Sequence, residues 1–408
     1  MRTTDAPRTE TFSEVDARGD LPLVIAHSFE VWLPLTMTWA FNEVKYAEGT
    51  DALVLAGSTA NLGRFPWRSI YVGGEGMWGR LVRDARRLRL RVSPPAYVRA
   101  FRERHPTVLH SHFGYRGWND LPLARRFGTP HVVTFYGHDV TMYPRTWPVW
   151  RRRYEELFAA ADLVLCEGPF MAGSIVELGC PQDKVRVQRL GVETDRLPCR
   201  PRMVEPEGPV RVLIAGGFRP KKGIPAGLEA VGAARAAGHD VRVTLIGGSN
   251  GSPVEEAERR RIDEVIRRRR LEDVVTARGM VPYDELVHAF YDHHIFLAPS
   301  LSAPDGDSEG GAPVTIVEAA SSGMPVVATT HCDIPQVVED GVTGVLVPEG
   351  DQEALDTRFT DLVGRPDLWP AMGVAAGRLA RARFDVRVCA GALVRTYGEL
   401  VARNRTGR

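Results

Sequence analysis

The amino-acid sequence predicts an α/β protein in which two doubly wound parallel sheets face each other across a cleft. Short continuous apolar runs recur along the whole chain, as expected of parallel strands that are buried on both faces. Segments with helical character separate these runs, and a proline-rich polar linker at 201–209 divides the series in two. The chain has 408 residues, enough for two domains of roughly 150 residues or more. We therefore expect one domain at 21–200 and a second at 210–375.

The composition is that of an ordinary globular protein, with 44% hydrophobic residues, 25% charged residues and a net charge of +1. A near-neutral chain argues against a nucleic-acid partner, for which a strongly basic balance is expected. The five cysteines are scattered and lack CxxC spacing, so we expect reduced thiols and a cytoplasmic protein. Residues 1–20 have no apolar core and predict a disordered tail, not a signal peptide. The apolar window at 21–41 contains charged and proline residues, which excludes a membrane span.

The first domain is expected to begin with a strand at 21–26, whose apolar run ends before His27. The further predicted strands, some written with their exit loops, cover residues 51–56, 108–114, 131–139, 161–166 and 185–192. Ligands of such sheets bind beyond the carboxyl ends of the strands. Thr36 and Thr38 follow the first strand and lead into a helix through Tyr46. We assign these two threonines, together with His112, to the acceptor side of a site.

Three patterns in the chain resemble metal sites, and we predict no metal at any of them. His110 and His112 form an HxH pair, but no third ligand of convincing spacing follows them. His331 and Cys332 are neighbours without further ligands, and the acidic turn at 305–307 matches a DxD pattern by letters only.

The region at 80–104 is rich in arginine. A basic face of this kind is able to touch an anionic membrane surface or a phosphorylated acceptor. The simpler interpretation is a solvated helical hairpin in an arginine-biased chain. Peripheral membrane contact through this region is therefore an open expectation.

The second domain is expected to open with a strand at 210–215 that ends in Gly216 and Gly217, followed by the lysine pair Lys221 and Lys222. The segment is neither a dinucleotide GxGxxG nor a P-loop, because no GK[ST] follows at the required spacing. The whole chain contains only four lysines, so an adjacent pair indicates a function that arginine does not serve. Glycines at a strand end with cations beside them suit a diphosphate, and a surface lysine pair is the alternative.

A stretch at 305–330 combines an acidic turn, two glycines, a short helix expected at 313–322 and a buried strand. Free backbone N–H groups and the dipole at a helix N-terminus bind phosphate. Glu309 and Glu318 flank this helix start, and carboxylates are suited to sugar hydroxyls more than to phosphates. The combination predicts a nucleotide-sugar site, with solvated helix-start glutamates as the alternative.

The same stretch, SEGGAPVTIVEAASSGMPVVAT at 308–329, resembles the acidic donor-sugar motif of retaining glycosyltransferases of family 4 (GT4). Residues 216–223, 131–139, 274–282 and 331–336 resemble other segments of that family. The resemblance covers nearly the whole chain and is tightest over 210–348. It implies a GT-B fold, in which two Rossmann-like domains enclose the active site.

The chain departs from the family pattern at two places. Seven residues usually separate the two motif glutamates, whereas eight lie between Glu309 and Glu318. Tyr136 occupies the position of a family histidine that lies near the reacting sugar, and His138 follows two residues later. A tyrosine hydroxyl donates hydrogen bonds but is no base near neutral pH. Either His138 has taken over the role of the family histidine or the chain functions without such a histidine. The structural alternative is that His138 is a helix-start residue capped by Asp139.

The resemblance implies transfer of a sugar from a nucleotide sugar, with UDP- or GDP-sugars favoured, to a hydroxyl of a saccharide, lipid-linked or natural-product acceptor. Lys222 matches the family lysine that neutralises the leaving phosphates, and Arg219 stands in for an arginine whose position is Gly217 here. The implied catalytic residues are Lys222, Arg219, Glu309, His138 and Tyr136. The implied donor-binding residues are Gly216, Gly217, Gly310, Gly311, Ala312, Pro313, Val314, Thr315, Glu318, Met280 and Val281. The resemblance further implies retention of the anomeric configuration, without a cofactor or a metal. It also implies a C-terminal helix at 376–408 that packs back on the first domain.

Other classes of function stay open. A same-fold nucleotide-sugar epimerase or a binding protein without turnover is compatible with the missing family histidine. A glycoside hydrolase is able to use paired carboxylates, but that reading leaves the lysine pair unexplained. Product that forms only when an acceptor is added distinguishes transfer from all of them.

Overall fold

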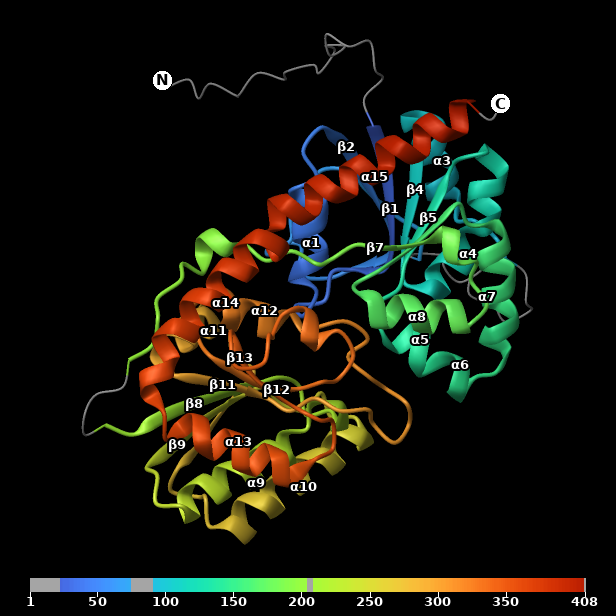
Figure 1. Cartoon of the computed structure of the whole chain (residues 1–408). Helices are drawn as coiled ribbons and strands as arrows, with labels where there is room; N and C mark the ends of the chain where they lie inside the picture. Colours follow the sequence, from blue (N-terminus) through green and yellow to red (C-terminus); the bar gives the residue numbers. More distant parts are fainter. Residues whose placement is uncertain (1–22, 75–90, 204–207, 407–408) are drawn as a thin grey trace, which may run out of the picture.

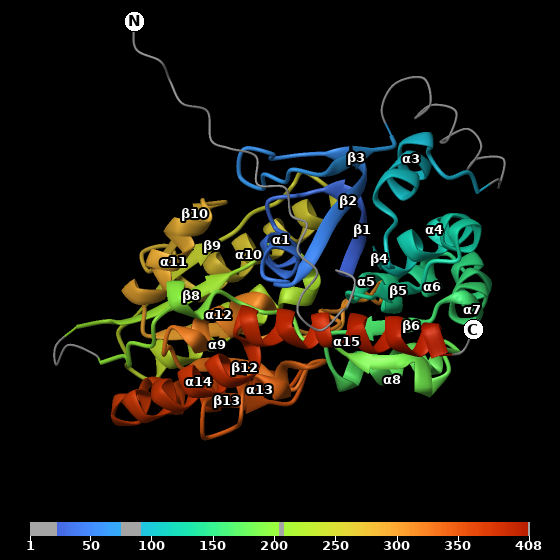
Figure 2. The ribbon, with the colours of Figure 1, turned by 90° about the horizontal axis from the view of Figure 1, so that it is seen from above.

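The computed structural model describes residues 23–74, 91–203 and 208–406 and consists of two halves, each built on a parallel sheet (Figures 1 and 2). The tail predicted at 1–20 and residues 80–90 of the arginine-rich region lie outside the described residues. Among the helices that the structure describes, none is long and apolar enough to cross a membrane.

The sheet of the first half is fully parallel. Among the described residues it has seven strands in the order β3-β2-β1-β4-β5-β6-β7. They are β1 (Leu23–Trp32), β2 (Thr50–Thr59), β3 (Ile70–Val72), β4 (Val108–His112), β5 (His131–Thr134), β6 (Leu163–Cys166) and β7 (Val185–Val187). Parallel neighbours need crossover connections, and the helices between the strands supply them.

Helices cover both faces of this sheet. Leu53 and Leu109 pack against α3 and α4 on one face, whereas Ile25 and Val108, from the alternate positions, pack against the C-terminal helix α15 on the other. The helices of this half are α1 (Thr38–Lys45), α3 (Pro95–Arg104), α4 (Gly114–Phe127), α5 (His138–Thr141), α6 (Tyr143–Thr146), α7 (Val149–Ala160) and α8 (Pro169–Glu177).

The second half repeats this arrangement with a sheet in the order β10-β9-β8-β11-β12-β13. Its strands are β8 (Val210–Ala215), β9 (Val241–Ile246), β10 (Val275–Gly279), β11 (Ile295–Ala298), β12 (Val326–Thr329) and β13 (Gly344–Val347). One face packs against α9 (Ile224–Ala236), α10 (Pro253–Arg269) and α13 (Gln352–Val363). The other face packs against α11 (Tyr283–Asp292), α12 (Val314–Ser321) and α14 (Trp369–Phe384).

Local sequence signals set several of these helix boundaries. The Ser252 side chain accepts a hydrogen bond from the backbone N–H of Glu255 at the start of α10, and Asp351 does the same for Ala354 in α13. Such caps satisfy donors that the first turn of a helix leaves free. Pro313 precedes α12, where its missing N–H carries no cost.

Helix α15 (Val386–Thr406) connects the two halves. It leaves the second half after α14 and runs over the first half (Figures 1 and 2). Its Leu393, Tyr397 and Leu400 are buried against Ile25 and Leu163 of the first sheet. The chain therefore ends on the half in which it begins.

The first strand is longer than the sequence predicted. The apolar run was expected to end before His27, but β1 continues to Trp32. His27 and Ser28 are fully buried, and both have polar partners in the interior. A hydrophobicity pattern does not predict buried polar residues of this kind.

Candidate active site

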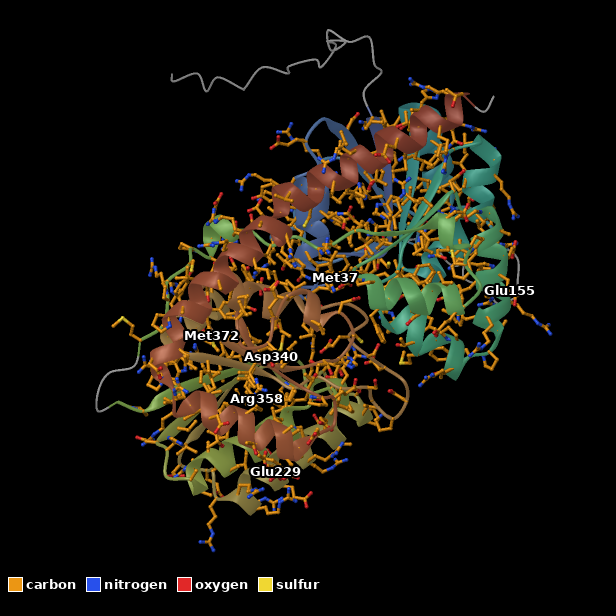
Figure 3. The ribbon with its side chains drawn as sticks, viewed as in Figure 1. Met37, Glu155, Glu229, Asp340, Arg358 and Met372 are labelled. Carbon is orange, nitrogen blue, oxygen red and sulfur yellow. The ribbon has the colours of Figure 1, made fainter. Side chains whose placement is uncertain are left out.

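A cavity of about 460 Å³ lies between the two halves. One wall is formed by the loop after β1 and the start of α1, and the other by the ends of β8 and β9, the loop after β10 and the start of α12. The residues predicted from sequence that line it are Thr36, Thr38, Gly216, Gly217, Met280, Val281, Val314, Thr315 and Glu318. Met37, between the two threonines, lies at the level where the halves meet (Figure 3). The structure thus brings most of the predicted donor-binding residues to one cavity.

The loop that follows β8 carries a cluster of cations paired with two carboxylates. Lys222 Nζ lies 2.9 Å from Glu309 Oε1, and Lys221 Nζ lies 3.2 Å from Asp307 Oδ1. Arg219 Nη2 contacts the other oxygen of Asp307 at 2.7 Å. The sequence singled out Arg219, Glu309 and the lysine pair, but it did not predict that Asp307 contacts two of these cations. Their pairing keeps the cationic loop in place next to Glu309.

Glu309 is ionised although its side chain is only 6% exposed. Burial alone raises the pKa of a carboxyl, but Lys222 and Lys221 outweigh this effect and hold the pKa of Glu309 at about 2. The hydroxyl of Ser300 donates a hydrogen bond to Oε1 at 2.9 Å. The backbone N–H of Glu309 donates to Nε2 of His331 at 3.1 Å. His331, dismissed as a metal ligand, therefore positions Glu309.

The two glycines after Glu309 allow the halves to touch. Gly310 has φ +77°, and a Cβ there would lie 2.3 Å from Cα of Gly137 in the first half. A Cβ on Gly311 would lie 2.1 Å from Oε2 of Glu167. Both glycines were expected among the donor-binding residues, and the space beside them is occupied by the opposite half. Ala312 and Pro313 then lead into α12, whose first residue is Val314.

Glu318 lies on α12 and lines the cavity. The hydroxyl of Tyr283, on α11, donates a hydrogen bond to its Oε1 at 2.7 Å. Burial raises the pKa of Glu318 to about 7, although this hydrogen bond acts in the opposite direction. Glu309 and Glu318 thus have carboxyl pKa values pushed apart by their surroundings. Tyr283 had no signal in the sequence because its partner is far away in the chain.

Two family models match the chain, one on each half. The model described as "Glycosyltransferase Family 4" matches residues 51–196, and the model described as "Glycosyl transferases group 1" matches residues 209–364. Both halves of the chain therefore match models of glycosyltransferases.

Curated relatives of the chain include proteins that are named for polysaccharide biosynthesis. The putative colanic acid biosynthesis glycosyltransferase WcaL of Salmonella typhimurium is 34% identical over 62% of this chain and 61% of its own length. The amylovoran biosynthesis glycosyltransferase AmsK of Erwinia amylovora is 32% identical over 66% of this chain and 64% of its own length. The chain spans about 60% of the length of these relatives.

Solved structures share the fold of the chain. HepE of Anabaena in complex with UDP and glucose has a TM-score of 0.73 and 17% identity, over 92% of this chain and all of that chain. Sucrose-phosphate synthase from Thermosynechococcus elongatus has a TM-score of 0.73 and 18% identity, over 93% of this chain and all of that chain. The predicted class, two Rossmann-like domains in a GT-B arrangement, is confirmed.

The position of the family histidine is resolved by geometry. The hydroxyl of Tyr136 lies 2.6 Å from Nδ1 of His112, inside the first half, and the ring packs 4.4 Å from that of Trp39. Tyr136 is 8% exposed, and the bond to His112 holds its hydroxyl inside the first half; a catalytic role for Tyr136 stays a prediction. His138 is half-buried.

The charges around His138 link it to the cationic loop. Burial lowers the pKa of His138, and the charges of Asp139, Lys221, Asp307 and Arg219 act on it as well. The Asp139 carboxylate accepts hydrogen bonds from the backbone N–H groups of Tyr136 and Gly114 and so fixes the start of α5. The helix-start position of His138 is thus present in the structure, and its role in the site stays a prediction.

His112, which was predicted to lie on the acceptor side, is not among the residues that line the cavity. His112 is fully buried, and its ring stacks on Phe29 with centroids 3.9 Å apart. Strand β4 ends at His112 with its side chain in the core, so the side chain has no route to an acceptor. Thr36 and Thr38, by contrast, do line the cavity.

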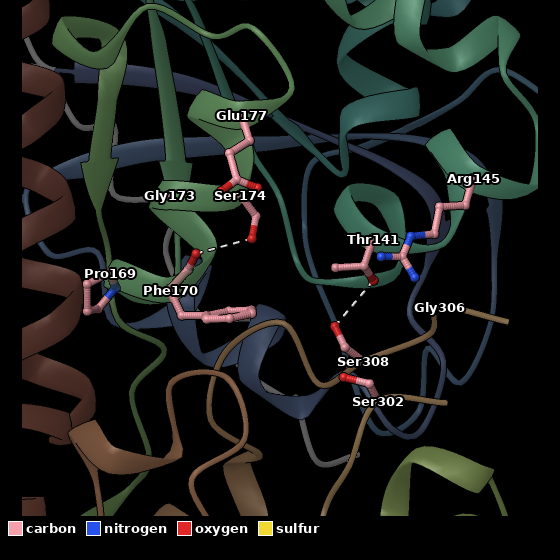
Figure 4. Close-up of a pocket in the computed structure, with 10 residues that line it drawn as sticks. All are labelled: Thr141, Arg145, Pro169, Phe170, Gly173, Ser174, Glu177, Ser302, Gly306 and Ser308. Carbon is pink, nitrogen blue, oxygen red and sulfur yellow. Dashed lines mark hydrogen bonds between the residues drawn. The ribbon is translucent and has the colours of Figure 1, made fainter. Parts of the chain in front are cut away.

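A second cavity, of about 480 Å³, adjoins the loop that leads to Glu309. Arg145 of α6 and Phe170 of α8 lie on opposite walls (Figure 4). Ser308 forms part of the lining, and its hydroxyl donates a hydrogen bond to Thr141 at 3.2 Å. The sequence analysis missed this cavity because its walls come from distant segments of both halves.

Proposed function

We propose that the chain is a retaining glycosyltransferase that transfers a sugar from a UDP- or GDP-sugar to an acceptor hydroxyl, without a metal ion at the donor site. The observation that carries the proposal is the cationic loop of Arg219, Lys221 and Lys222, held against two buried carboxylates beside the cavity between the halves. A cavity of about 460 Å³ is within the usual range of small-molecule sites, roughly 300–1,000 Å³.

The positive charge of the cationic loop is suited to the negative charge that develops on the leaving diphosphate. When the sugar leaves, negative charge grows on the diphosphate, and cations that are already positioned stabilise it without reorganisation. Lys222 and Arg219 serve this purpose. A diphosphate that takes Lys222 as its partner releases Glu309 from that ion pair, and the carboxylate then accepts hydrogen bonds from sugar hydroxyls.

The proposed reaction has a simple balance of bonds. The bond between the anomeric carbon and the diphosphate oxygen breaks, and a bond from the acceptor oxygen to the same carbon forms on the same face. The acceptor proton passes to an oxygen of the departing diphosphate. No covalent intermediate on a side chain is required, and His138 contributes a polar contact beside the reacting sugar.

Glu318 fits the ribose of the donor. Its Oε1 accepts from Tyr283, which leaves Oε2 to accept hydrogen bonds from ribose hydroxyls. Met280 and Val281, which line the same cavity, lie where the base is held.

We infer a saccharide acceptor, because the relatives WcaL and AmsK are named for colanic acid and amylovoran biosynthesis. Lipid-linked saccharides belong to the same class of hydroxyl acceptor. The binding of this substrate at the inner face of a membrane is part of the proposal.

The test is release of nucleoside diphosphate from UDP-glucose, UDP-galactose and GDP-mannose, measured with and without a panel of saccharide acceptors. The proposal predicts release and a glycosylated product with one donor, both dependent on acceptor, and retention of the anomeric configuration by NMR. Release of free sugar from simple glycosides, or epimerisation of the donor without acceptor, would contradict it.

A further inference from the structure

The HxH pair of strand β4 belongs to a cluster of four buried side chains in the first half. His27 of β1, Glu43 of α1 and His110 and His112 of β4 each offer one donor atom within 4.8 Å of the others. The three histidines are fully buried and Glu43 is 7% exposed. The sequence analysis searched only for ligands that follow the pair, whereas both additional groups come from earlier in the chain.

Two atoms of this cluster are unpartnered. Nε2 of His27 and Oε1 of Glu43 are buried and have no hydrogen-bond partner among the described residues. Buried polar side-chain atoms are normally paired, and an unpaired one calls for a specific explanation such as a bound ion. The unpaired Oε1 of Glu43 belongs to a group of four ligand-type side chains whose donor atoms lie within 4.8 Å of one another, which points to a partner at the centre of this group.

We propose that His27, Glu43, His110 and His112 bind one divalent transition-metal ion, with Zn²⁺ as the occupant that the donor set favours. Imidazole nitrogens with a carboxylate oxygen are typical ligands of zinc. The function of this ion is structural, since it ties α1 to the two central strands.

The measured separations suit a small coordination shell. Nδ1 of His27 lies 3.1 Å from Nε2 of His112, and Nδ1 of His110 lies 3.9 Å from Oε1 of Glu43. Zinc–ligand bonds of about 2.0–2.1 Å place tetrahedral ligand atoms about 3.4 Å apart. The cluster therefore needs small side-chain shifts to close around an ion.

Hydroxyl groups orient the two β4 histidines from outside the cluster. Nδ1 of His112 bonds the hydroxyl of Tyr136, and Nε2 of His110 bonds that of Thr134, both at 2.6 Å. A second hydrogen bond that fixes the ring is the usual companion of a metal-bound histidine. The hydroxyl of Tyr397 lies 2.6 Å from Nδ1 of His110 and turns away from this atom when the ion binds.

The experiment measures metal in the full chain, purified with a tag that contains no histidine and without chelators. Mass spectrometry is expected to find about one zinc ion per chain, and a cobalt-loaded sample to show the visible absorption of a four-coordinate site. His27→Gln and Glu43→Gln are expected to lose at least about nine-tenths of the zinc. The control is His131→Gln, because His131 is equally buried but lies outside the cluster.

Wild-type protein with less than about a tenth of an ion per chain, and with no visible spectrum in cobalt, overturns the proposal in favour of a metal-free hydrogen-bond network. Zinc that both variants retain overturns it as well. The wild-type spectrum does not depend on whether a variant folds. Neither result bears on the transferase proposal, since the readouts are metal content and absorption.

Discussion

The Lys222–Glu309 contact joins two residues that lie 87 positions apart in the chain, and both were selected from the sequence. Lys222 was selected because lysine is rare in the chain, and Glu309 because of the spacing of the acidic motif. Asp307 and Tyr283 were not selected, because a pattern reports residue types along the chain but not which side chains face each other. Tyr136 and His112 were placed at the substrate for the same reason: the sequence does not show that a strand-end side chain points into the core.

The raised pKa of Glu318 predicts a dependence of stability on pH. Burial moves this pKa from an ordinary value near 4.5 to about 7. The contribution of Glu318 to stability is therefore complete below its unfolded pKa and is lost as the pH rises through 7. Glu318→Gln carries no charge at this position. As the pH is raised from 5 to 8.5, its melting temperature is therefore expected to rise by several degrees relative to that of wild type.

The control for this prediction is Glu353→Gln, because Glu353 is exposed on α13. Its melting temperature is expected to follow that of wild type at every pH. A difference between Glu318→Gln and wild type that stays constant over the pH range would show that Glu318 ionises normally.

The contrast between His138 and Tyr136 gives a second prediction. His138→Asn is expected to lower kcat by about 10²-fold, because His138 lies at the charged cluster and such groups typically contribute this much or more. Tyr136→Phe removes only the buried bond to His112 and is expected to keep near-normal kcat while losing about 1–3 kcal/mol of stability. Steady-state kinetics on both variants measures the contrast, and a larger effect of Tyr136→Phe on kcat contradicts it.

At the scale of elements, strands and helices with uniform apolar patterns were predicted well. The helix expected at 313–322 corresponds to α12, and the strand expected at 210–215 corresponds to β8. Strand β1 was cut short at His27, because its second part consists of polar residues that find partners only in the folded sheet. The pairing of α15 with the first sheet could be inferred only from the family resemblance, since no local signal reports a contact between chain ends.

The packing of α15 is expected to contribute to the stability of the first half. Leu393 is fully buried against the sheet, and truncation of such a leucine costs about 2–5 kcal/mol. Leu393→Ala is therefore expected to lower the urea midpoint of unfolding substantially. Val388→Ala on the same helix serves as control, because Val388 is 47% exposed and its truncation is worth about 0.5 kcal/mol or less. Equal effects of the two variants would mean that α15 is only loosely attached.

At the scale of the whole molecule, the two halves meet through backbone as well as side chains. Gly310 touches Gly137, and Asp333 of the second half accepts a hydrogen bond from the backbone N–H of Phe170 in the first at 2.8 Å. The sequence predicted two halves and the loops that face each other. It did not predict how closely they approach, because this distance depends on the fit of both surfaces.

This contact predicts that Gly310→Ala impairs the enzyme by holding the halves apart. The added methyl group meets Cα of Gly137 at 2.3 Å, and displacement of catalytic groups by about 1 Å is enough to cost about 10²-fold in rate. Gly341→Ala is the matched control, because Gly341 has φ +72° but nothing within 4 Å of a new Cβ. The strain of positive φ, about 1–2 kcal/mol, is common to both variants. Initial rates and small-angle scattering measure the effect, and equal loss in both variants would assign it to backbone strain alone.

The most direct measurement of the central claim is thermal unfolding with UDP, GDP, dTDP and ADP, each with and without EDTA, for wild type, Lys222→Ala and the control Lys45→Ala. Lys45 forms an ion pair with Glu193 and its side chain is 44% exposed. At about 100 times its dissociation constant a ligand adds about 2.7 kcal/mol of stability, which raises the melting temperature by several degrees. The account predicts such a rise with UDP or GDP, unchanged by EDTA and by Lys45→Ala, and lost in Lys222→Ala. Absence of any rise with all four nucleotides, or a rise that Lys222→Ala leaves intact, would contradict the nucleotide-sugar site.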